Sequence, residues 1–211
     1  MRATGHSACS SSTRAFKSKH VGVYNLERTM RMRRAERHDQ ILAAATRAFA
    51  RSGFAATGLD DVAAEAGVSR VILYRHFESK SDLYRAVLDH ACSRLAAAVG
   101  RDDYTPGSVD ALLEAAAADP DGFRLLFHHA VREPEFRAEV DALRAGSVEI
   151  ARRYYDEVIP DRAWAAWATQ LTPTVAVDAV IAWLDAGQPD REGAAARILQ
   201  VLGAIADAAQ R

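Results

Sequence analysis

Apolar residues recur every three or four positions along most of this chain, which is the spacing of one face of a helix. No stretch alternates apolar and polar residues as a half-buried strand does. Proline and glycine separate the later helices, and Pro173 predicts a kink inside one of them. The pattern predicts an all-α protein with helices at residues 59–66, 70–77, 83–99, 109–118, 121–131, 135–158, 163–186 and 191–208.

The first two of these helices are short and have clear signals at their ends. Asp60 and Asp61 lie in the first turn of the first helix, where negative charge suits the positive end of the helix dipole. Gly67 follows the last apolar position and suits the left-handed conformation that ends a helix. Ser69 is then placed to cap the next helix. The segment therefore predicts two short helices joined by a tight turn.

The second short helix has two different sides. Leu73 and Phe77 fall together and are expected to face the core, whereas the opposite side carries Val71, Ile72, Tyr74 and Arg75. Arginine pairs with guanine or phosphate, tyrosine reaches phosphate, and aliphatic methyl groups contact thymine methyls. We expect this side to enter the major groove of DNA, with Lys80 just beyond it meeting the backbone.

A glycine turn between two short helices by itself indicates only an ordinary helical hairpin. This segment contains more: an apolar helix, a Gly-aromatic turn, a threonine, AGVS, LYRHF and SK in succession. In this combination, residues 34–94 resemble the amino-terminal domain of the TetR family of bacterial regulators. The matching positions are Ile41, Leu42, Ala45, Phe49, Gly53, Phe54, Thr57, Val62, Ala63, Ala66, Gly67, Val68, Ser69, Leu73, Tyr74, Arg75, His76, Phe77, Ser79, Lys80, Leu83 and Tyr84.

The resemblance implies a three-helix helix-turn-helix DNA-binding domain at residues 34–94, with its motif at about 58–77, joined to a helical effector-binding and dimerisation bundle at 95–211. It implies a ligand-responsive repressor that binds a palindromic double-stranded operator as a homodimer, with no cofactor and no catalytic residues. An activator of the same architecture is the alternative, because the position of the operator decides the direction of control. The positions expected to contact DNA are Thr57, Gly58, Ser69, Arg70, Val71, Ile72, Tyr74, Arg75, His76 and Lys80.

Two positions depart from the family pattern. Gly58 stands where relatives carry a serine or threonine that caps the helix and touches a phosphate, so that contact requires Thr57 instead. Val71 and Ile72 replace a usual Gly-Thr pair, which removes a hydroxyl contact at Ile72. We expect the target sequence to differ from that of relatives with the usual residues.

The second region offers candidates for a ligand and for a second subunit. Aromatic residues with a polar group combine burial with orientation in small-molecule cavities, although they are more often ordinary core. The candidates for an effector pocket are Phe123, Phe127, His128, Tyr154, Trp164 and Trp167. The last two helices carry more apolar surface than their own packing requires. The candidates for a dimer interface are Val180, Ile181, Leu184, Ile198, Leu202 and Ile205.

Charge is unevenly distributed although the net charge is −1. Residues 1–94 hold 16 Lys and Arg against 9 Asp and Glu, whereas residues 95–211 hold 11 against 19. A basic amino-terminal half suits phosphate contact. Cys9 and Cys92 have neither metal nor disulfide-framework spacing, and Asp178 interrupts the richest apolar stretch. We expect a cytoplasmic protein with two free thiols and no membrane span.

The segment 1–33 is basic, rich in small polar residues and without helical periodicity, which predicts disorder. Three interpretations remain open. It is a basic arm that adds DNA affinity, an organelle transit peptide, or a passive or artefactual extension before a true start at Met30 or Met32. The last is favoured.

Two further function classes are compatible with parts of the sequence. His129 and Glu133 are four residues apart, as metal ligands of an enzyme can be, but no second pair, HExxH motif or nucleophile with a base accompanies them. The sequence therefore predicts no metal site. An adaptor protein would use the outward side of the second short helix to bind protein, and its complexes would resist salt, whereas DNA binding weakens steeply with salt.

Overall fold

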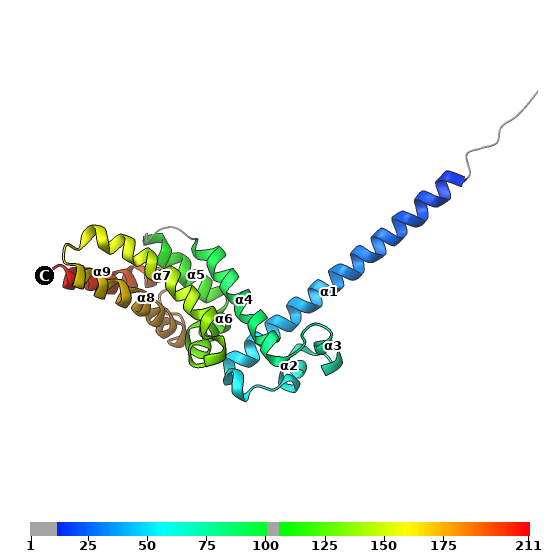
Figure 1. The fold of residues 1–211 in the computed structure, drawn as a ribbon, viewed down its shortest axis with the longest axis horizontal. Coiled ribbons are helices and arrows are strands. Elements are labelled where there is room, and N and C mark those ends of the chain that lie inside the picture. Colours follow the sequence, from blue (N-terminus) through cyan, green and yellow to red (C-terminus); the bar gives the residue numbers. More distant parts are fainter. Residues whose placement is uncertain (1–11, 101–105) are drawn as a thin grey trace, which may run out of the picture. The chain divides into compact units, whose positions relative to one another are not determined.

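The computed structural model describes residues 12–100 and 106–211, and every element assigned within these ranges is helical (Figure 1). This confirms the predicted all-α class. The elements before residue 100 are α1 (Ser12–Ala56), α2 (Leu59–Ala66), α3 (Arg70–Tyr74) and α4 (Lys80–Val99). Those after residue 105 are α5 (Pro106–Ala118), α6 (Pro120–Arg124), η1 (Leu125–His129), η2 (Ala130–Arg132), η3 (Pro134–Phe136), α7 (Arg137–Val158), α8 (Arg162–Asp185) and α9 (Ala194–Ala209).

The start of α1 differs from the sequence-based expectation. The helix begins at Ser12, inside the segment 1–33 for which the sequence predicted disorder. A helix satisfies its backbone hydrogen bonds internally and does not require an apolar stripe, so periodicity did not indicate it. Residues 1–11, including Cys9, lie outside the described residues. The chain divides into two compact units at Gln40, and residues 41–211 form the larger one.

The carboxyl-terminal part of α1 packs with α2, α3 and the start of α4 around a shared apolar core. Leu73 and Phe77 are buried as predicted, with 1% and 6% of their surfaces exposed. The other buried residues of this group include Ile41, Leu42, Ala45, Phe49, Val62, Ala63, Ala66, Leu83, Tyr84 and Val87. Burial of this apolar surface fixes α3 from its inner side and leaves its outer side to solvent.

The helix ends form largely as the local sequence predicts. Gly67 adopts φ 64°, and the Val68 N–H donates to the Ala63 carbonyl at 3.0 Å, which closes α2. The Gly58 N–H donates to Asp61 Oδ2 at 2.7 Å and so starts the same helix. Ser69 precedes α3 as predicted, but its hydroxyl makes no capping hydrogen bond. The side chain of Ser79, which precedes α4, accepts a hydrogen bond from the Asp82 N–H.

Gly53 interrupts α1 with a backbone conformation of φ 73° and ψ 174°, a region that is essentially restricted to glycine. Gly53→Ala is expected to lower the free energy of unfolding by about 1–3 kcal/mol. Urea denaturation followed by circular dichroism measures this change. Gly203→Ala is the matched control, because Gly203 lies within α9 with open space around its Cα, so alanine there should stabilise slightly. Equal stability of the two variants would contradict the assigned strain.

The second half of the chain forms a helical bundle in which α8 packs between α7 and α9, and α5 contacts α4, α8 and α9. The predicted continuous helix at 121–131 is wrong: the segment consists of α6, the π-helical turn η1 and the 3₁₀ turn η2. Apolar spacing does not distinguish these hydrogen-bond patterns. The other predicted helices start and end within a few residues of the observed bounds.

The residues proposed for the dimer interface largely belong to the chain's own core. Five of them, on α8 and α9, are part of the buried core and have less than a tenth of their surfaces exposed: Val180, Leu184, Ile198, Leu202 and Ile205. Ile181 is half-buried against the same core. Periodicity indicated an apolar face on each helix but not that these two faces cover one another.

Candidate DNA interface and ligand cavity

The outer side of α3 is open to solvent and carries the side chains that the sequence assigned to DNA. Val71 is 63% exposed and Tyr74 is 47% exposed, and Arg70 and Arg75 are exposed beside them. An exposed valine and tyrosine next to two arginines form an apolar and cationic surface on a short helix. Ile72 differs from the expectation, because it is half-buried and packs against the core, so only part of it faces outward.

Arg70 connects the starts of α2 and α3. Its guanidinium donates to Asp60 Oδ2 at 3.1 Å and to the Tyr74 hydroxyl at 3.3 Å. The hydrogen bond to Tyr74, followed by the charge of Asp60, raises the pKa of Arg70 above its ordinary value. The pair orients Tyr74 on the outer side of α3 before any partner binds.

Two residues assigned to DNA also make contacts within the fold. The Thr57 hydroxyl is buried and donates to the Gly53 carbonyl at 2.7 Å. Lys80 Nζ donates to the carbonyls of Phe54 and Thr57 at 2.7 and 2.9 Å and lies 4.3 Å from the centre of the Phe54 ring. The ammonium group therefore ties the start of α4 to the end of α1.

Lys80→Met keeps the aliphatic stem and removes both hydrogen bonds to the carbonyls. We expect the free energy of unfolding to fall by about 1–2 kcal/mol, because hydrogen bonds from a charged donor are stronger than average and this site is half-buried. Chemical denaturation measures the change. Unaltered stability combined with weaker DNA binding would show that Lys80 serves as a phosphate contact after all.

Arginines of α1 hold α2 in place through a single carboxylate, a role that no sequence pattern indicated. Arg47 Nε and Arg51 Nη2 donate to the two oxygens of Glu65 at 2.8 and 2.9 Å. Hydrogen bonding to Arg47 and then to Arg51 lowers the pKa of Glu65 below its ordinary value. The arginines stand 18 and 14 positions before Glu65, so no local pattern pairs them with it.

The bundle contains a cavity of about 280 Å³ between α4, α5, α7 and α8. Phe127 is the one predicted pocket residue among the described residues that line it. Pro173, which is buried and lies inside α8, lines the cavity too. The lining consists of Leu95, Ala96, Val99, Gly100, Ser108, Val109, Leu112, Phe127, Ala142, Leu143, Gly146, Ser147, Ile150, Pro173, Ala176 and Val177.

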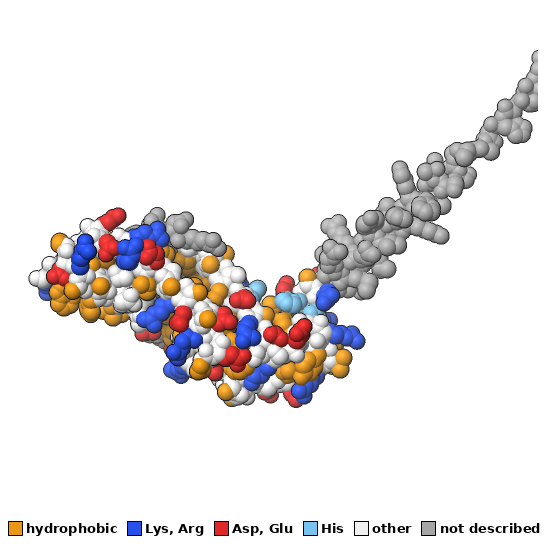
Figure 2. Space-filling view, in the orientation of Figure 1, with side chains coloured by type: hydrophobic (Ala, Val, Ile, Leu, Met, Phe, Trp, Pro, Cys, Tyr) orange, Lys and Arg blue, Asp and Glu red, His pale blue; other side chains and the backbone are white. Residues whose placement is uncertain are grey.

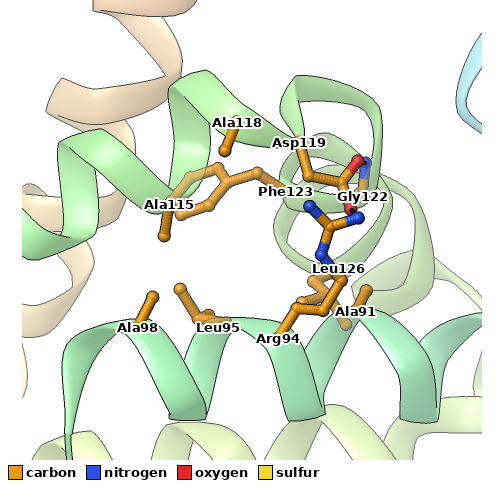
Figure 3. Close-up of a pocket in the computed structure, with 10 residues that line it drawn as sticks. All are labelled: Ala91, Arg94, Leu95, Ala98, Ala115, Ala118, Asp119, Gly122, Phe123 and Leu126. Atoms are coloured by element: carbon orange, nitrogen blue, oxygen red, sulfur yellow. Dashed lines mark hydrogen bonds and ion pairs between the residues drawn. The ribbon is translucent and has the colours of Figure 1, made fainter.

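A smaller pocket of about 90 Å³ lies on the other side of Leu95, between α4, α5 and α6 (Figure 3). Phe123 lines it, and Arg94 faces Asp119 across it at 3.4 Å. Its volume is well below that of ordinary small-molecule sites. Phe123 is therefore placed in a packing gap rather than in the larger cavity.

The remaining predicted pocket residues lie at the surface. Tyr154, Trp164 and Trp167 have 46%, 50% and 41% of their surfaces exposed, and His128 is exposed as well. The two tryptophans contact one another edge to face, with ring centres 5.5 Å apart. Aromatic character alone predicted burial for these residues, but the apolar sides of α7 and α8 are already occupied by each other.

A cluster of aromatic rings joins the α1–α4 segment to the bundle. The fully buried Phe136 ring lies 4.8 Å from Phe54 and 4.5 Å from Tyr84, measured between ring centres. The Arg85 guanidinium covers Phe136 at 5.2 Å and pairs with Glu135 at 3.2 Å. Burial raises the pKa of Tyr84, whose hydroxyl has no partner. No local pattern in the sequence indicated this role for Phe136.

His129 and Glu133 take part in the same contact region. Burial lowers the pKa of His129, and an interaction with the backbone of Ala50 acts in the opposite direction. Within residues 12–100 and 106–211, no group of three or more His, Cys, Asp or Glu side chains is arranged to hold a metal ion. In the same ranges, no helix has both the length and the apolar character to cross a bilayer. Cys92 is a free thiol.

Comparison with known proteins identifies relatives of this chain. Residues 41–87 match the family described as bacterial regulatory proteins, tetR family. The chain is 30% identical over 178 residues to the HTH-type transcriptional activator FasR of Mycolicibacterium smegmatis, covering 78% of this chain and 80% of that protein. It is 34% identical over 120 residues to an HTH-type transcriptional repressor of Streptomyces coelicolor, covering 51% of this chain and 62% of that protein.

Solved structures agree with these sequence relatives. A TetR-like transcriptional regulator from Rhodococcus sp. superposes with a TM-score of 0.64 at 20% identity, covering 81% of this chain and 93% of that chain. At this identity the likeness concerns the fold alone. Together with the relative matched over most of its length, it accounts for both the α2–α3 motif and the bundle.

Proposed function

Since this chain belongs to the tetR family of bacterial regulatory proteins, and is a DNA-binding transcriptional regulator rather than an enzyme, we propose that it is a ligand-responsive repressor. Regulators of this family bind DNA and small-molecule effectors and act as dimers. We propose a DNA-reading domain at residues 34–94 and an effector and dimer domain at residues 95–211, with the protein acting in the cytoplasm.

The observation that carries the DNA proposal is the free outer side of α3. We propose that Val71 and Tyr74 approach base edges and backbone in a major groove, with Arg70 and Arg75 supplying positive charge. Ser69, Gly58 and His76 flank this surface at the ends of the two motif helices. Leu73 and Phe77 hold the helix from the opposite side, so the contact surface is presented without rearrangement of the core.

The proposed operator is a near-palindrome. A twofold dimer places two copies of α3 about 34–36 Å apart, one turn of DNA, or a multiple of it. Selection of bound fragments from genomic DNA by the purified full chain tests this. Enrichment of an inverted repeat whose binding weakens steeply with salt supports the proposal. Recovery of no specific fragment, or of a salt-insensitive protein complex through α3, contradicts it.

The direction of control requires a separate measurement. One relative is named an activator and another a repressor, so the family permits both outcomes. A reporter gene behind the selected operator is expected to be more active when the protein is deleted. Reduced reporter activity after deletion would identify an activator of the same architecture.

We propose that the homodimer forms through the outer sides of α8 and α9. Trp164, Trp167 and Val201 keep 50%, 41% and 50% of their surfaces exposed. On the face shown in Figure 2, apolar side chains gather along the edge formed by these two helices. Large exposed aromatic side chains are typical anchors of protein interfaces.

Trp164→Asp combined with Trp167→Asp is expected to shift the protein from dimer to monomer, because charged groups are depleted from interface centres. Sedimentation velocity measures this shift. Tyr154→Asp is the control, since Tyr154 is exposed to a similar degree on α7. Persistence of the dimer in the double variant would place the interface elsewhere.

The cavity and the DNA-reading part are connected by one helix. Residues of α4 line the cavity at Leu95, Ala96 and Val99, while Lys80 at its other end binds the carbonyls of Phe54 and Thr57. We propose that an effector in the cavity shifts α4 and favours a state in which the two copies of α3 no longer match the operator. Phe127 in the π-helical turn η1 contributes a second route towards His129 and Ala50.

A further inference from the structure

The side chains around the larger cavity define the chemistry of its ligand. The described lining residues are aliphatic, aromatic or small, and none of them is charged. Ser147 donates its hydroxyl to the Leu143 carbonyl at 3.4 Å, and Ser108 is also engaged in an interaction. Apart from these two serine hydroxyls, the described lining side chains offer no strong hydrogen-bonding group, so a charged or polyhydroxylated ligand would lose most of its hydration without replacement.

We infer that the cavity binds an unbranched aliphatic chain whose polar head group remains at the mouth. This inference rests on the proposed role of the cavity as the effector site. The volume of about 280 Å³ lies at the small end of ligand sites, which suits a slender molecule better than a polycyclic one. Leu95, Val99 and Val109 on one side and Ile150, Ala176 and Val177 on the other supply contacts to methylene groups without directional bonding.

Gly146 provides a way to block the cavity without disturbing the bundle. It lies within α7 and lines the cavity, and a Cβ built on it meets no atom within 4 Å. A leucine at this position therefore has open space to occupy. Gly146→Ala is the matched control, because it makes the same change in helix propensity with a single methyl group. Both variants are expected to melt at or above the temperature of the unaltered protein.

The test measures binding of 1-hexanol, 1-octanol and 1-decanol to the full chain by isothermal titration calorimetry. Each added methylene group is expected to raise the affinity by about fourfold until the cavity is filled. The diol 1,10-decanediol should bind at least about fivefold more weakly than 1-decanol, because its second hydroxyl would be buried without a partner. Gly146→Leu should weaken 1-decanol binding by about fivefold or more, whereas Gly146→Ala should leave it within about twofold.

Three outcomes would overturn the inference: affinity that does not depend on chain length, equal affinity for the diol, or an unchanged affinity for 1-decanol in Gly146→Leu. Operator binding is measured separately with and without 1-decanol. Chain-length dependence without any effect on DNA binding upholds the ligand class and contradicts the proposed regulation. Failure of operator binding in the absence of alcohol contradicts the proposed function alone.

Discussion

Val71→Glu is expected to reduce the affinity of the protein for its selected operator by about 100-fold or more, because like charges in contact cost several kcal/mol. The substitution places a carboxylate on the outer side of α3, where the proposed partner is a polyanion. Val71 is 63% exposed, so its replacement removes little packing, and stability should change by about 0.5 kcal/mol or less. Fluorescence anisotropy with a labelled operator, alongside thermal melting, measures both effects.

Val131→Glu is the matched control for this prediction. Val131 is 41% exposed and belongs to η2, away from the α2–α3 motif. The same change of charge there should leave operator affinity within about threefold, since exposed charges far from the contact are screened by salt. If both variants bind the operator as tightly as the unaltered protein, α3 is not the DNA-reading element.

Phe136→Ala is expected to have the largest effect on stability, a loss of about 3–5 kcal/mol in the free energy of unfolding. Phe136 is fully buried and contacts the rings of Phe54 and Tyr84. Its removal leaves a cavity where the α1–α4 segment meets the bundle and takes away the ring beneath Arg85. Urea denaturation at constant protein concentration measures the loss, since dimerisation would otherwise contribute.

Tyr154→Ala is the control for the loss of an aromatic ring. Tyr154 is 46% exposed, so its truncation should cost about 1 kcal/mol or less. Phe136→Leu should be much more stable than Phe136→Ala, because leucine refills most of the volume. A Phe136→Ala variant as stable as Tyr154→Ala would show that this contact is not packed as the structure describes.

The aromatic cluster also bears on the proposed regulation. Phe136 follows the segment that runs from Phe127 at the cavity, and its partner Tyr84 lies on α4, whose far end lines the same cavity. An effector that displaces either element acts on side chains already in contact with the end of α1. If 1-decanol changes the operator affinity of Phe136→Leu less than that of the unaltered protein, the result would support this route.

Local sequence was sufficient to predict the α2–α3 motif. The positions of Leu73 and Phe77, the left-handed Gly67 and the exposed Val71 follow from helical periodicity and from the conformations that each residue type permits. These features depend on neighbours within one or two helical turns. The same information predicted an all-α chain and most of its helix boundaries.

Other assignments depended on residues far apart in the chain. Lys80 has the positive charge expected of a phosphate contact, yet its hydrogen-bond partners are carbonyls 23 and 26 positions earlier in the chain. Trp164 has the aromatic side chain with a polar group that is typical of ligand pockets, yet half of its surface faces solvent. In neither case do the residues adjacent in sequence indicate which groups surround the side chain in the folded protein.

The sequence by itself determined which side of each helix is apolar, because side-chain order along a helix fixes that pattern. Only the tertiary structure decided what covers each apolar side: α9 buries against the bundle through Ile198 and Leu202, while Trp164 and Trp167 of α8 stay exposed. The hydrophobic effect is non-directional, so burial against any apolar partner is favourable. Which surfaces pair is therefore decided by how closely the helices pack together.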